Sequence, residues 1–119
     1  MSTLRVNTIN DISSSGATLL NGSATNMLGY NQTWQDVKSS RTGNSTAYQN
    51  TTGKPIMVAI SENYGGDPQY QVSSDGSSWV PVGITGANST HSFSFIVPNN
   101  HYYRWTASNP TPLFWAELR

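Results

Sequence analysis

Residues 55–61 read Pro-Ile-Met-Val-Ala-Ile-Ser, and this stretch decides the fold class. Its apolar side chains alternate, so that Ile56, Val58 and Ile60 point to one face of an extended strand. Met57 and Ala59 point to the opposite face. Because both faces are apolar, the segment is predicted to be a strand in the middle of a sheet.

Shorter patterns of the same kind recur on both sides of this strand, with turn residues between them. Asp75-Gly76 predicts a hairpin, and Pro110 and Pro112 must lie in a connection or at an edge because neither donates to a ladder. No segment has a helical period. Strands are predicted at residues 33–37, 46–49, 55–61, 69–73, 78–82, 92–97, 102–107 and 113–118.

The predicted fold is therefore all-β, a β-sandwich of jelly-roll-like or immunoglobulin-like type that spans residues 33–119. Its buried side chains are predicted from their period-2 spacing to be Ile56, Val58, Ile60, Val72, Phe93, Phe95 and Trp105. Residues 1–32 have weaker periodicity and are predicted to be an extended N-terminal arm or adapter. In this arm Leu4, Val6 and Ile9 are expected to contact a partner protein, for instance as a strand added to an exposed sheet edge.

The composition indicates a polar but neutral surface. Ser, Thr and Asn make up 42 of the 119 residues, while only 12 residues are charged and the formal net charge is zero. This argues against binding to nucleic acid or to anionic lipid, both of which require a basic surface. The chain has no cysteine, no apolar run long enough to span a membrane and no secretory signal at its start. A soluble protein made in the cytoplasm is expected.

The residues that carry chemistry in other proteins are sparse in this chain. His91 and His101 are the only histidines, and no close carboxylate or cysteine completes a zinc ligand set. Asp67 and Asp75 lie in Gly- or Pro-flanked turns, where aspartate is expected to bond its own backbone. The Gly-rich spots precede no helix, so no phosphate loop is predicted. No catalytic residue, metal site or cofactor is expected, and the chain is predicted not to be an enzyme.

The aromatic residues leave two interpretations open. Aromatic faces stack on sugars, but a Trp within a strand more often packs in a core or a subunit interface. Tyr64 and Tyr70 border the polar Gly65-Gly66-Asp67 loop and are expected to be exposed, as contacts to a glycan or another surface. Phe114 and Trp115, near the end of the chain, are expected at or near a subunit interface.

Two stretches resemble proteins of tailed bacteriophages. The opening MSTLRVNTINDISSSGAT resembles N-terminal segments of virion structural proteins from phages of cyanobacteria and other marine bacteria. The region from Thr33 to Tyr103 is similar to terminal domains of phage and prophage tail-fibre proteins. The stretches that carry this likeness are TWQDV, SSRTGNSTAYQNTTGKPIMVAIS, VSSDGSSWVPVG and FIVPNNHYYRW.

The resemblance implies a compact β-sandwich module, often trimeric, on a fibre or on the head surface, without catalytic residues. No fibre shaft separates arm and module here, which favours a trimeric capsid decoration or cement protein that binds the major capsid protein through the arm. The alternative is a short tail fibre or receptor-binding tip that binds a host glycan. A third interpretation is a cell-encoded carbohydrate-binding module. The expected location is the virion.

Overall fold

A computed structural model describes residues 26–63, 66–86, 89–108 and 111–119 of the chain. The described residues contain eight strands and the short 3₁₀ helix η2, joined by turns and loops. No helix in this part of the chain is long and apolar enough to cross a membrane. The predicted all-β fold is confirmed. The bounds of the elements are β1 (Trp34–Asp36), η2 (Lys38–Ser40), β2 (Tyr48–Gln49), β3 (Ile56–Glu62), β4 (Gln69–Ser73), β5 (Val80–Ile84), β6 (His91–Val97), β7 (Tyr102–Trp105) and β8 (Phe114–Leu118).

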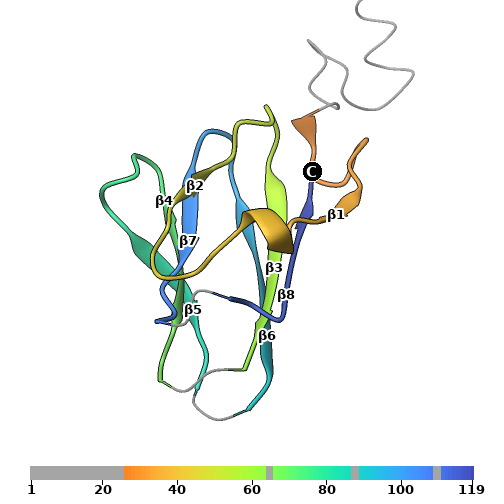
Figure 1. Ribbon diagram of the computed structural model, residues 1–119. Coiled ribbons are helices and arrows are strands. Elements are labelled where there is room, and N and C mark those ends of the chain that lie inside the picture. Colours follow the sequence, from red (N-terminus) through yellow and green to blue (C-terminus); the bar gives the residue numbers. More distant parts are fainter. Residues whose placement is uncertain (1–25, 64–65, 87–88, 109–110) are drawn as a thin grey trace, which may run out of the picture.

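The strands form two antiparallel four-stranded sheets packed as a β-sandwich. Sheet A has the order β1-β8-β3-β6, and sheet B has the order β2-β7-β4-β5. Figure 1 shows the two sheets as separate layers. As predicted, β3 lies in the interior of its sheet, between β8 and β6. Each predicted strand corresponds to an observed one, although β2 begins two residues later than predicted, β5 is shifted two residues later as a whole, and β7 ends two residues earlier.

The core lies between the sheets and is built from the alternate residues that the sequence pattern predicts. Ile56, Val58, Ile60, Phe95 and Trp105 are buried, which confirms five of the seven predicted core residues. Val72 and Phe93 are only half-buried, although both pack against the core. Val72 lines a groove between β5 and β6, and Phe93 lies on β6, the edge strand of sheet A. The Trp105 and Trp115 rings meet edge to face in the centre, with their centroids 6.4 Å apart.

A charged residue lies in this core. Glu117 on β8 points inward and is fully buried, and its carboxylate accepts hydrogen bonds from Arg41, Arg119, the Tyr103 hydroxyl and the Trp115 indole. Burial by itself raises the pKa of a carboxyl group, but the hydrogen bonds from Arg41 and Tyr103 and the charges of Arg41 and Arg119 lower the pKa of Glu117 below its ordinary value. Glu117 is therefore a satisfied, ionised core residue that fixes the segment around Arg41 to β8.

The turn in the phrase Asn50-Thr-Thr-Gly-Lys-Pro is held by a buried amide. The Asn50 side chain donates to the carbonyls of Lys54, Val97 and Pro98, so it joins the turn before β3 to the turn after β6. Gly53 has a φ of 87°, a conformation that a residue with a side chain rarely adopts. Asn50 and Gly53 account for the conformation of this turn.

The predicted arm falls mostly outside the described residues, which begin at Asn26. The last residues before β1 contact the sandwich: Lys54 donates to the Tyr30 carbonyl over 2.8 Å, and Gln32 donates to the Pro55 carbonyl over 2.8 Å. The chain therefore enters the sandwich beside the start of β3.

Candidate protein interface

The outer face of sheet A carries an apolar row that crosses all four strands. Strand register places Trp34 of β1 opposite Leu118 of β8, Leu118 opposite Met57 of β3, and Met57 opposite Ile96 of β6. Side chains on directly paired residues of one face lie about 4.5–5.5 Å apart at their Cβ atoms, so the four form a continuous line. Trp34 is 54% exposed and Ile96 is 52% exposed.

The same face continues with small and apolar side chains on β3 and β8 toward the far end of these strands. Ala116 pairs with Ala59 in the next row, and Phe114 pairs with Ser61 beyond it. Phe114 is 69% exposed, the highest value among the large apolar side chains that the structure describes as exposed. By strand alternation, Asp36 is the one charged residue that the described strands of sheet A place on this face.

An apolar groove lies beside the row, at the open side of the sandwich. Strands β5 and β6 are the edges of their sheets on this side. Val80 and Val82 of β5 line the groove together with Ile96 and Pro98, and the groove has a volume of about 360 Å³. Ile96 thus borders both the groove and the apolar row, and the two surfaces join at the β6 edge.

The two sheets are closed at the opposite end of β5. The Phe93 ring of β6 lies against the backbone of Gly83, where an added Cβ atom would come within 2.4 Å of the ring. The Thr85 hydroxyl also donates to the buried Glu62 carboxylate at the end of β3, over 2.5 Å. The groove is therefore open at Val80 and Val82 and blocked at Gly83.

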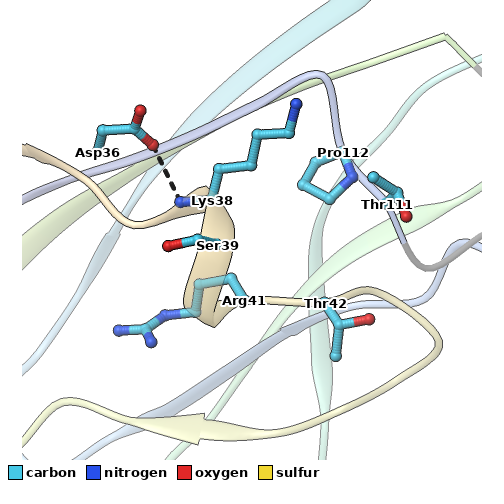
Figure 2. Close-up of a pocket in the computed structure, with 7 residues that line it drawn as sticks. All are labelled: Asp36, Lys38, Ser39, Arg41, Thr42, Thr111 and Pro112. Carbon is cyan, nitrogen blue, oxygen red and sulfur yellow. Dashed lines mark hydrogen bonds between the residues drawn. The ribbon is translucent and has the colours of Figure 1, made fainter.

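A separate polar cleft of about 510 Å³ lies on the other side of the molecule, around η2 (Figure 2). In this view the Lys38 side chain extends toward Pro112, and Asp36 accepts a hydrogen bond from the Lys38 backbone over 3.0 Å. The Arg41 guanidinium points away from Pro112 and binds Glu117 instead. The cleft therefore offers hydroxyl groups and one charge of each sign, a set suited to a neutral polyhydroxyl ligand. Its lining residues are Asp36, Lys38, Ser39, Arg41, Thr42, Thr111 and Pro112.

Among the residues that the structure describes, the groups associated with catalysis or metal binding are not brought together. The His91 Nε2 atom and the Ser89 hydroxyl lie 2.8 Å apart and exposed, and no hydrogen bond joins His91 to a carboxylate among the residues described. No group of three or more His, Cys, Asp or Glu residues that suits a metal ion occurs in the same part of the chain. Asp75 caps its own turn, as predicted, by accepting from the Ser77 and Ser78 backbones, and these bonds lower its pKa.

Some of the predicted site residues lie outside the described part of the chain, and one that was expected to be exposed is buried. Leu4, Val6, Ile9 and Tyr64 lie outside the described residues. The prediction that Tyr70 is exposed is wrong, because its side chain is fully buried and its ring stacks on Phe93 with the centroids 4.9 Å apart. Burial, together with the Glu62 charge, raises the pKa of Tyr70 to about 12.

Of the two predicted interface residues, only Phe114 reaches the surface. Trp115 is 1% exposed because it is the next residue along β8 and therefore points to the opposite, core face. Sequence reasoning missed Trp34, Met57, Ile96 and Leu118 as one surface. The signal was present in the apolar outer face of residues 56–60, but only the register shows which residues of the other strands lie beside Met57.

Comparison with known proteins gives no match: no protein-family model, no curated protein and no solved structure is found to be similar to this chain.

Proposed function

We propose that this chain is a non-enzymatic structural protein of a bacteriophage particle, which acts as a homotrimer and decorates the head as a cement protein. The observation that supports it is the largely apolar face on the outside of sheet A, where Trp34, Ile96 and Phe114 are exposed and Asp36 is the one charged residue of the described strands. Monomeric proteins rarely expose contiguous apolar patches, and a patch of this kind marks a contact with another protein.

The composition of the face fits a contact between protein subunits. Aromatic residues and Met are enriched in the buried centres of interfaces, and charged residues are depleted there. Trp34 and Phe114 supply the large side chains that usually carry most of the binding energy. Phe114 was expected at the subunit interface from the sequence, and we assign Trp34, Met57 and Leu118 to the same contact.

The assignment to a phage particle rests on the resemblance of the two sequence stretches described above. In this proposal the N-terminal segment, with Leu4, Val6 and Ile9, makes a further protein contact within the particle. A trimer on a symmetric site of the shell presents each weak contact three times, so modest contacts add up to stable attachment. The protein is made in the host cytoplasm and becomes part of the virion.

A second candidate function is a tail-fibre or receptor-binding tip that binds a host surface glycan. The polar cleft around Lys38 favours it, because a volume of about 510 Å³ with hydroxyl and charged groups suits a sugar. The cleft has no aromatic side chain among its lining residues on which a sugar ring could stack. The buried Tyr70 does not supply one either. We therefore rank this function second.

Quantitative mass spectrometry of purified particles and of tailless heads distinguishes the two. A cement protein is expected in high copy number on tailless heads. A receptor-binding tip is expected in few copies, and only on complete particles. Absence of the protein from purified particles would contradict both.

A further inference from the structure

Strand β6 is an unprotected sheet edge. It pairs with β3 on one side, and no described strand pairs with its other side. Natural edge strands avoid pairing with other chains by being short, by carrying charge or proline, or by a bulge. The edge strands β1 and β2 have three and two residues, and β5 carries Pro81 and a register shift against β4. Strand β6 has seven residues, His-Ser-Phe-Ser-Phe-Ile-Val, with none of these features.

The apolar groove lies where a strand added to this edge would place its side chains. Alternate residues of such a strand point inward, toward sheet B. Between the edges of the two sheets these side chains meet Val80 and Val82 of β5. The closed end at Gly83 and Phe93 limits the added strand to the part of β6 near Ile96. The site therefore accepts a short strand with two apolar residues spaced by one polar residue.

Residues 3–9 of this chain, Thr-Leu-Arg-Val-Asn-Thr-Ile, have this pattern. If these residues are extended, alternation puts Leu4 and Val6 on one face and Arg5 and Asn7 on the other. The chain enters the sandwich beside Lys54, at the end where β3 begins and β6 finishes, because Ile56 pairs with Val97. Residues 10–25, if extended, span on the order of 50 Å at about 3.3 Å per residue, which is enough to reach an adjoining molecule.

We infer that Leu4 and Val6 of one copy insert beside β6 of a neighbouring copy and fill the groove at Val80 and Val82. This inference rests on the proposed homo-oligomer and names the partner of the N-terminal segment. The segment and the groove are different surfaces, so the contact is head-to-tail, and contacts of this type close into rings such as a trimer. Main-chain hydrogen bonds to β6 supply affinity, and the groove selects the alternate side chains.

Cysteine cross-linking of the full chain tests this directly, because the natural sequence has no cysteine. Copies with Val6→Cys are co-expressed with tagged copies that carry Val82→Cys, and the purified protein is oxidised mildly. A disulfide forms only when the two Cβ atoms approach to about 4 Å. We expect a non-reducing gel to show a disulfide-linked pair with one copy of each kind. Val82 is 42% exposed, so its replacement leaves the core intact.

In the matched control, the tagged copies carry Ser39→Cys instead of Val82→Cys. Ser39 lies in η2 beside β8, away from β6. We expect at least tenfold less of the mixed pair with this control. Equal cross-linking at both positions would overturn the inference. So would a Val6→Cys/Val82→Cys double variant that forms only a disulfide within one chain. If no pair forms and the protein is still a trimer, the inference fails and the proposed function stands; a monomer contradicts both.

Discussion

The Arg41 guanidinium donates two hydrogen bonds to the fully buried Glu117 carboxylate, from Nε to Oε1 over 2.9 Å and from Nη2 to Oε2 over 3.1 Å. Arg41 follows η2, so this pair ties the wall of the polar cleft to β8. If one partner of a buried ion pair is removed, the other charge remains buried without compensation, and the folded state loses stability.

Removing the guanidinium should therefore destabilise the protein strongly. For Arg41→Ala we expect a loss of about 3–5 kcal/mol in the free energy of unfolding, because a buried carboxylate loses its main partner. Urea unfolding followed by circular dichroism measures it. The control is Arg119→Ala, whose more exposed side chain makes one bond to Glu117 and should cost at most about 1 kcal/mol. Equal losses for the two variants would contradict the assigned role of Arg41.

The same network predicts how stability depends on acid. The pKa of Glu117 is lowered in the folded chain, so its contribution is complete above the ordinary carboxyl pKa and is lost as the pH falls through the folded value. The stability difference between the natural protein and Glu117→Gln should shrink as the pH is lowered below about 4.5. Urea unfolding of both proteins across this range checks it, and a pH-independent difference would show that Glu117 is not ionised in the fold.

Alkaline titration should reveal the buried tyrosines. Burial raises the pKa of Tyr70 to about 12 and that of Tyr103 further. Because the unfolded side chains ionise near 10, stability should be complete below pH 10 and fall as the pH rises toward 12. Ultraviolet absorbance should show that Tyr70 and Tyr103 form tyrosinate only at high pH, together with unfolding. Replacement of Tyr70 by Phe should remove one late group, and an unchanged titration would place Tyr70 at the surface.

The sequence predicted the fold better than the site, and the reason is physical. Alternation in residues 56–60 shows which side chains share a face, and this is enough to identify a central strand and its buried residues. It does not show which strands are neighbours, since register arises from long-range pairing such as Met57 with Leu118. Phe114 and Trp115 are predicted together at or near a subunit interface, whereas a strand points adjacent residues to opposite faces, so that only Phe114 reaches the surface. Tyr70 is predicted to be exposed because it borders the Gly65-Gly66-Asp67 loop, but it lies at the first inward-facing position of β4.

Ile60 tests the assigned register of the core. Its side chain is buried on β3, so Ile60→Ala should cost about 2–5 kcal/mol in unfolding free energy. The control is Ile84→Ala on β5, which removes the same groups from an exposed position and should change stability by less than about 0.5 kcal/mol. Chemical denaturation gives both values. A loss below about 0.5 kcal/mol for Ile60→Ala would place Ile60 outside the core.

Gly83 tests how the sheets close beside the groove. A Cβ atom at this position would lie 2.4–2.7 Å from three atoms of the Phe93 ring, and that ring stacks on Tyr70 and has little freedom to shift. Gly83→Ala should cost about 1–3 kcal/mol. Gly86→Ala, where a Cβ atom meets nothing within 4 Å, is the control and should have little effect. In a Phe93→Ala background, the added cost of Gly83→Ala should disappear, and its persistence would refute the contact.

The measurement that tests the central claim most directly is sedimentation equilibrium of the full chain. A structural subunit that associates through the outer face of sheet A should sediment as a trimer, three times 13.0 kDa, or 39.0 kDa. The variant Trp34→Ser/Phe114→Ser should shift the protein to monomer without loss of its β-sheet circular dichroism. The control variant Ile84→Ser, which removes an equally exposed apolar side chain from sheet B, should remain trimeric. A natural protein that stays at 13.0 kDa at all concentrations, or a Trp34→Ser/Phe114→Ser variant that stays trimeric, would contradict the account.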